Sequence, residues 1–174
     1  MLRHALTAIA LGGLASIASA EIVAASPDHY TLRHEANSSI APEALWERLI
    51  RPETWWHPDH TYSGEAQNLS LTPRAGGLWL EAWAGSSVEH GRVLTIMEGE
   101  MLRLDAPFGP LQGMGVQVVW TITLEAHEET GGTRIIFDEI ANGSSASGLD
   151  AIAPAVDGVK QEAITRLAGP SVKN

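Results

Sequence analysis

Cysteine is absent from the 174-residue sequence, so neither a disulfide nor a thiolate metal site can hold the fold together. The chain must therefore rely on a hydrophobic core, and its length is enough for one domain with a sizeable core. Two catalytic signatures are also missing, the HExxH motif of zinc proteases and the GxSxG nucleophile elbow. No internal repeat and no long linker divides the chain.

Basic residues are scarce in this sequence. Lys and Arg together number 11 against 21 Asp and Glu, which gives a net charge of −10 at pH 7. An acidic surface repels nucleic-acid phosphates and anionic lipid headgroups. We therefore expect neither a nucleic acid nor an anionic membrane surface as a partner.

Long apolar runs are also rare, and the one at the N-terminus is short. Residues 5–17 are apolar, follow an arginine, and lead into the small-residue motif ASA before Glu21. This layout is typical of a secretory signal peptide, whereas a membrane anchor, the alternative, needs about 20 apolar residues. We predict a signal peptide over residues 1–20 and a single domain over residues 21–174. The protein is expected to be exported, periplasmic or secreted, with no stable membrane insertion after removal of the leader.

Strand-like alternation covers most of the remaining chain. Residues 28–37 alternate apolar and polar side chains with the period of a half-buried strand. Six later segments have strand character and are separated by turn residues. They are residues 68–72, 77–84, 87–97, 101–106, 115–126 and 133–141.

Helical patterns lie on both sides of this run of strands. Residues 41–50 form an apolar stripe behind Pro42, and a further turn can follow in residues 52–56. Apolar residues from Leu149 to Leu167 step by three and four positions, which predicts a long C-terminal helix. The order predicts an α+β fold in which a curved antiparallel sheet of about six to seven strands surrounds that helix. One helix cannot fill a strongly curved sheet, so an apolar cavity is expected between them.

Several pieces of the chain, taken in order and spacing, are similar to those of a known superfamily. They are IAPEALWERLIRPETWW, AGGLWLEAW, VEHGRVLTIMEGEMLRL, FGPLQGMG and GGTRIIF, followed by a helix that contains VDGV and closes at LAGP. From about residue 30 to 168 the chain resembles the SRPBCC superfamily. This superfamily includes START domains, the birch-pollen-allergen fold, polyketide cyclases and domains resembling the activator of a heat-shock chaperone's ATPase. The resemblance implies a helix-grip fold with a cavity, but no single function, because members bind hydrophobic molecules or, in a minority, catalyse cyclisation.

The segment WWHPDHTY, residues 55–62, offers the best candidates for metal ligands. His57 and His60 lie three positions apart, and Asp59 could add an oxygen. Pro58 breaks any continuous helix through both histidines, so they are not placed on one shared face. We therefore expect no metal and no other cofactor.

The same segment is better suited to an apolar pocket. Trp55 and Trp56 are predicted to form an aromatic wall near the cavity, with His57, His60 and Tyr62 on its polar rim. The alternative is that one tryptophan simply packs the short helices onto the sheet.

A carboxylate and an imidazole are expected to meet in the first hairpin of the strand run. If Gly85-Ser86 forms its tight turn, Glu81 lies opposite His90, with Trp79 and Trp83 on the same side. Facing the cavity, this pair could hold the polar end of a ligand or move a proton. Facing solvent, it would be a surface ion pair, and a register slip of one residue would separate the two side chains.

The sequence thus predicts binding of a hydrophobic small molecule, lipid-like or polyketide-like, between the sheet and the C-terminal helix. The alternative is an enzyme of the cyclase or hydro-lyase type that uses His90 and Glu81 as its acid and base. A structural or partner-binding module is a third reading, if side chains fill the interior. The predicted ligand-binding residues are Trp55, Trp56, His57, Tyr62, Trp79, Glu81, Trp83, His90, Phe108, Met114, Trp120, Ile152 and Val156.

Overall fold

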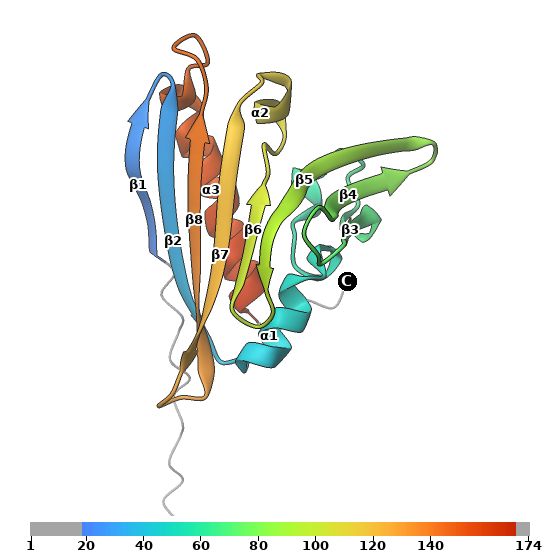
Figure 1. The fold of residues 1–174 in the computed structure, drawn as a ribbon, viewed down its shortest axis with the longest axis vertical. Coiled ribbons are helices and arrows are strands. Elements are labelled where there is room, and N and C mark those ends of the chain that lie inside the picture. The colour runs from blue at the N-terminus through green and yellow to red at the C-terminus, as the bar shows by residue number, and fades with distance from the viewer. Residues whose placement is uncertain (1–18, 170–174) are drawn as a thin grey trace, which may run out of the picture.

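Eight antiparallel strands form one continuous sheet in residues 19–169, the part of the chain that the computed structural model describes (Figure 1). Their order across the sheet is β1-β2-β8-β7-β6-β5-β4-β3. The bounds are β1 Ser19–Ser26, β2 His29–Ser38, β3 Leu69–Leu71, β4 Leu78–Trp83, β5 Ser86–Met97, β6 Met101–Asp105, β7 Gln117–His127 and β8 Gly132–Asn142. Strands β2 to β8 coincide with the seven predicted segments, so the predicted α+β arrangement is confirmed.

Strand β1 was not predicted, and it overlaps the end of the expected leader. Residues 1–18 lie outside the described part of the chain, so only Ser19 and Ala20 of the predicted signal peptide are described, as the start of β1. The strand pairs only with β2, and a bulge interrupts the register after Ile22. Ile22 and Val23 are exposed, so this alanine-rich edge strand has no alternation that would reveal it in the sequence.

The described residues form few helices, and the long one comes last. The bounds are α1 Pro42–Leu49, α2 Pro110–Gly113 and α3 Leu149–Ala168, with 3₁₀ turns η1 Pro52–Thr54, η2 Pro58–His60 and η3 Ala66–Asn68. Helix α3 begins at Leu149 and continues through Pro154. Proline removes one backbone donor but does not end the helix here. Within residues 19–169, no helix is both long and apolar enough to cross a membrane.

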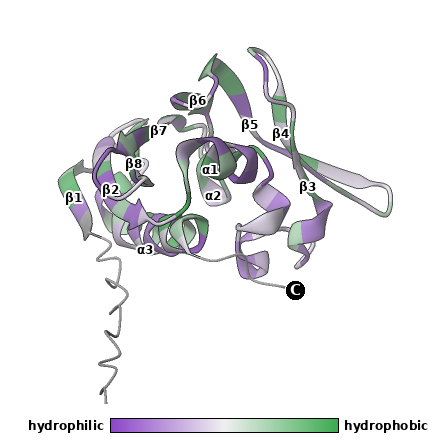
Figure 2. Ribbon diagram, turned by 90° about the horizontal axis from the view of Figure 1, so that it is seen from below, coloured by the Kyte–Doolittle hydropathy of each residue, from purple (hydrophilic) through white to green (hydrophobic). Residues whose placement is uncertain are grey.

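The sheet bends around its helices and leaves them unevenly distributed. Helix α3 packs on β1, β2 and β8, whereas β4 and β3 swing away on the side of the 3₁₀ turns (Figures 1 and 2). The buried apolar residues accordingly fall into two clusters. The larger one, which includes Trp79 and Leu104, lies under α1 and the end of α3, and the smaller one, with Leu32 and Leu149, lies under its start.

Candidate functional site

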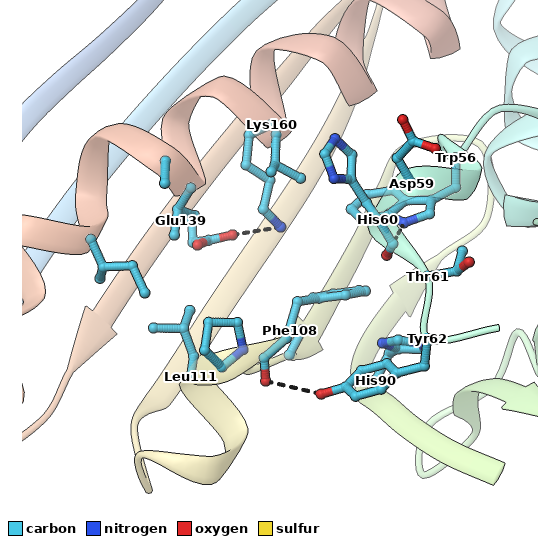
Figure 3. A pocket seen from close by; sticks show the side chains of 17 residues that line it. Trp56, Asp59, His60, Thr61, Tyr62, His90, Phe108, Leu111, Glu139 and Lys160 are labelled. Carbon is cyan, nitrogen blue, oxygen red and sulfur yellow. Dashed lines mark hydrogen bonds and ion pairs between the residues drawn. The ribbon is translucent and has the colours of Figure 1, made fainter. Parts of the chain in front are cut away.

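A cavity of about 570 Å³ lies between the sheet and α3 and draws its lining from both core clusters (Figure 3). Its volume falls within the range of small-molecule sites, roughly 300–1,000 Å³. Most of its wall is apolar or aromatic, and a few polar groups converge on it. The lining residues are Trp56, Asp59, His60, Thr61, Tyr62, His90, Ala106, Phe108, Gly109, Pro110, Leu111, Glu139, Ile152, Ala155, Val156, Val159 and Lys160.

Six of the predicted ligand-binding residues line this cavity directly. They are Trp56, Tyr62, His90, Phe108, Ile152 and Val156. Others lie one layer behind the wall, namely Trp55, Trp79, Glu81 and Trp120, which are all buried. The role of these residues in ligand binding stays a prediction.

Three predicted residues lie apart from the lining. Trp83 is the last residue of β4, half-buried at the hairpin end, and Met114 is an exposed residue that follows α2. His57 lies on the rim and contacts α3 instead of the cavity. The turn that aims Trp83 and the loop geometry after α2 depend on local backbone angles that side-chain alternation does not encode.

Aromatic rings from four parts of the chain pack around the cavity wall, mostly edge to face. The ring centroids of Trp55 and Trp79 lie 5.7 Å apart, and those of Trp56 and Trp79 lie 5.4 Å apart. Phe108 stacks on Trp56 at 5.2 Å and meets Trp120 at 5.8 Å. Such contacts stabilise a rigid apolar wall beyond the burial of area alone.

Glu81 and His90 contact each other, but not by the predicted register. The tight turn is formed by Ala84 and Gly85, both with positive φ, and not by the predicted Gly85-Ser86. Glu81 therefore lies opposite Val88 in the ladder. A bulge follows, and it turns the His90 side chain inward so that His90 Nε2 lies 2.7 Å from Glu81 Oε2. The predicted contact is therefore made, but the bulge produces it and direct cross-strand pairing does not.

The Glu81 carboxylate is fully buried and held by three donors. Besides His90, the backbone amides of Tyr62 and Ser63 donate to it at 3.0 and 2.6 Å. Burial raises the pKa of Glu81, but the hydrogen bonds from Ser63, Tyr62 and His90 outweigh it and bring the pKa below its ordinary value. The side chain is therefore an anion that fixes the loop of residues 61–65 to the sheet.

Burial favours the neutral form of the His90 imidazole. Burial lowers its pKa, and the contact with Glu81 offsets this only in part. A carboxylate can only accept, so Nε2 carries the proton that is donated to Glu81. Nδ1 is then an acceptor, and it is buried with no hydrogen-bond partner in the described part of the chain. The His90 ring stacks on Phe108 at 5.3 Å and lies 5.8 Å from the Tyr62 ring at the cavity mouth.

A second buried polar group, centred on Lys160 of α3, was not predicted. Lys160 Nζ lies 2.7 Å from Glu139 Oε2 of β8, and Tyr30 of β2 donates to the other oxygen of Glu139 at 2.6 Å. All three residues are at most 2% exposed. The ammonium also lies 3.2 Å from the centroid of the Trp120 ring, a cation–π contact. Burial lowers the pKa of Lys160, and Glu139 opposes that shift.

The sequence does carry a signal for this second group. Lys160 stands four positions after Val156 and three before Ala163, on the apolar stripe of the helix. Glu139 is likewise in phase with the buried Phe137 and Ala141. A charged residue at a position where the pattern requires an apolar one indicates a buried ion pair or a functional site. Considered alone, however, either residue resembles an ordinary surface residue.

Two histidines of the rim clasp one carboxylate of α3. Nε2 of His60 lies 3.0 Å from Glu162 Oε2, and Nε2 of His57 lies 3.5 Å from Glu162 Oε1. The amide of Asp59 donates to His57 Nδ1 at 3.1 Å, which orients that ring. These contacts fasten the segment that ends at Tyr62 over the cavity mouth. Within the described residues, no group of three or more His, Asp or Glu is placed to hold a metal ion.

Comparison with solved structures identifies the architecture. An uncharacterized protein from Rhizobium leguminosarum superposes with a TM-score of 0.58 at 18% identity, over 87% of this chain and 95% of that one. CalU16 from Micromonospora echinospora gives a TM-score of 0.55 at 15% identity, over 88% and 81% of the two chains. Ara h 8.0201 gives 0.54 at 16% identity, over 81% and 96%. The chain has the helix-grip fold. No family model and no curated protein matches the sequence.

The helix-grip fold accounts for the position of the cavity but not for its contents. Identities of 15–18% establish the fold alone. Function must therefore be argued from the side chains that this chain places around the cavity.

Proposed function

We propose that this protein binds a hydrophobic small molecule, lipid-like or polyketide-like, between the sheet and α3. One observation carries the proposal, the cavity of about 570 Å³ with its largely apolar and aromatic wall. Transfer of apolar area from water into such a site is favourable by roughly 25 cal/mol per Å². The rigid packing of Trp56 and Phe108 adds preorganisation, because the wall need not rearrange to receive a ligand.

Binding is tested by filling the cavity with a larger side chain. The exchange Val156→Trp places an indole in the space between α3 and Leu111, whereas Val23→Trp, on the exposed edge strand, makes the same change away from it. Native mass spectrometry of the purified protein should detect a co-purified apolar molecule in the Val23→Trp protein and not in the Val156→Trp protein. Equal occupancy in both proteins contradicts binding at this site.

A cyclase or hydro-lyase activity is the second candidate, and His90 is the observation that favours it. A neutral imidazole with a buried, unpartnered Nδ1 and a carboxylate on Nε2 has the arrangement of a general base whose tautomer is fixed. Turnover of a bound substrate that is abolished in His90→Ala, while ligand affinity is retained, would favour catalysis. Affinity and turnover lost together would favour simple binding.

We also propose that the protein acts after export, in the periplasm or outside the cell. The layout of residues 1–20, a short apolar stretch followed by small residues, supports this proposal. Expression in a secretion-competent bacterium followed by N-terminal sequencing should give a chain that begins at Glu21. A cytoplasmic chain that retains Met1 contradicts export.

A further inference from the structure

Lysine is rare in this protein, and one lysine is used in an unusual place. The sequence has nine arginines but only Lys160 and Lys173. Surface positions are the usual ones for lysine, which is almost never fully buried unless paired. Lys160 is 2% exposed and belongs to the cavity lining. The chain thus places a lysine in the lining of a cavity whose wall is mostly apolar.

The surroundings of this amine hold it in place without satisfying it. Nζ lies 3.2, 4.8 and 5.9 Å from the ring centroids of Trp120, Phe108 and Trp56. Within residues 19–169, its one anionic partner is Glu139, with Nζ 2.7 Å from Oε2. This approach is an ion contact without hydrogen-bond alignment, so both atoms lack an aligned partner there. Among the described residues, the hydrogen atoms on Nζ therefore have no aligned acceptor.

Stability does not explain why a lysine occupies this position. A buried ion pair is often no more stable than apolar residues of similar volume, because desolvation of both charges offsets their attraction. A methionine at position 160 would continue the apolar stripe of α3. An amine retained at such a cost, beside an ionisable partner and on a residue that lines a cavity, is a candidate for chemistry.

We propose that Lys160 captures an apolar aldehyde or ketone in the cavity as an imine. This inference rests on the proposed function, since the carbonyl compound is the hydrophobic ligand. A buried amine is suited to this reaction because an apolar site favours its neutral, nucleophilic form. Burial acts on Lys160 in this direction, as the lowering of its pKa indicates.

The proton balance of the step uses only groups that are already in place. The ammonium of Lys160 gives one proton to Glu139, and the resulting amine attacks the carbonyl carbon to form a C–N bond. Glu139 returns the proton to the carbonyl oxygen, which becomes a hydroxyl. This hydroxyl takes a second proton from the attacking nitrogen and leaves as water when the C=N bond forms. The sum is ammonium plus carbonyl compound to protonated imine plus water, with no oxidation or reduction. Tyr30, whose hydroxyl bonds Glu139, is a positioning residue that keeps the carboxylate directed at Nζ.

The two-lysine composition allows a clean test by reductive trapping. The full chain is incubated with 2-naphthaldehyde and sodium cyanoborohydride, which reduces an imine to a stable secondary amine, and the adducts are mapped by peptide mass spectrometry. We expect modification of Lys160 to exceed that of Lys173 by about tenfold or more, because a bound carbonyl reacts as an intramolecular partner. In guanidinium chloride the preference should disappear. The double variant Lys160→Met/Glu139→Gln, which keeps the site neutral, should lose the adduct in this peptide, and Lys173→Arg should keep it.

A non-condensing analogue separates this inference from the proposed function. 2-Naphthalenemethanol has the same ring system but cannot form an imine, and its binding is followed by quenching of tryptophan fluorescence. Quenching together with the Lys160 adduct supports capture. Quenching with adducts only on Lys173 or the terminal amine, or with none, overturns capture and leaves hydrophobic binding intact. Absence of both quenching and the Lys160 adduct overturns both proposals.

Discussion

His90 Nε2 lies 2.7 Å from Glu81 Oε2, although the two residues are not cross-strand partners. Between Trp79 and Leu80 the β4–β5 ladder shifts by one residue, and His90 is the extra residue of β5 at that point. The bulge re-aims a side chain toward the cavity, a common use of bulges beside functional sites. Next to it, Gly91 approaches Ala106 so closely that an added Cβ would lie 2.9 Å from the Ala106 Cβ. The bulge is therefore built into the packing of β5 on β6.

The exchange Glu81→Gln should destabilise the protein in a pH-dependent way. The folded-state pKa of Glu81 is lowered, so the carboxylate contributes stability above the unfolded pKa, about 4.3, and loses it as pH falls through the folded value. At pH 7 we expect a loss of about 1–3 kcal/mol, because an amide cannot accept all three donors. Urea unfolding at pH 7 and pH 3 should show this difference shrinking in acid. Glu47→Gln, on the exposed side of α1, should leave the free energy of unfolding nearly unchanged in both measurements.

The exchange His90→Phe should flatten the stability profile between pH 7 and pH 5. The folded-state pKa of His90 is lowered by burial, so the unfolded chain binds more protons below about pH 6.5 and stability falls there. Removing the imidazole removes this part of the slope. His34, whose pKa burial also lowers despite Asp157, keeps part of the slope in the variant. An unchanged slope, measured by urea unfolding at half-unit pH steps, would show that His90 is not held neutral.

The fold could be predicted from the sequence where one face of a strand is buried and the other is wet. In β2 the buried Tyr30, Leu32 and His34 alternate with less buried residues, and this period is visible in the sequence. Strand β1 lacks this alternation, because its consecutive residues Ile22 and Val23 are both exposed. Edge strands bury little, so pairing with β2 and not a hydrophobic pattern places β1 in the sheet.

The site could be predicted only in part, for a different reason. Aromatic residues of the segment 55–62 and Phe108 are large enough to indicate a wall on their own. Lys160 and Glu139 could not be paired from the sequence, because their contact is purely tertiary and forms only when α3 packs against β8. The contact of Glu81 with His90 was predicted from the wrong turn residues. The actual turn includes Ala84, and a positive φ is uncommon for a residue with a side chain.

The ion pair of Lys160 and Glu139 should show strong coupling in a double-mutant cycle. Lys160→Met alone leaves the Glu139 charge buried and unpaired, which costs about 3–5 kcal/mol. Adding Glu139→Gln removes that charge, so the double variant should recover most of the loss. Chemical denaturation of the four proteins gives the coupling energy. Additive losses would mean that the two side chains do not interact in the folded protein.

The rim clasp should control the exchange rate of a ligand more than the stability of the fold. Glu162 is partly exposed, so its ion pairs with His57 and His60 are worth at most about 1 kcal/mol. The segment they fasten nevertheless carries Asp59 to Tyr62, which line the cavity mouth. In Glu162→Ala we therefore expect faster release of 2-naphthalenemethanol in stopped-flow displacement, with little change in the urea midpoint. Glu47→Ala, which touches no rim residue, serves as the control. Loss of the ion pairs to Glu162 should make the mouth segment open faster. A release rate equal to that of the unmodified protein would therefore show that the ligand leaves by another route.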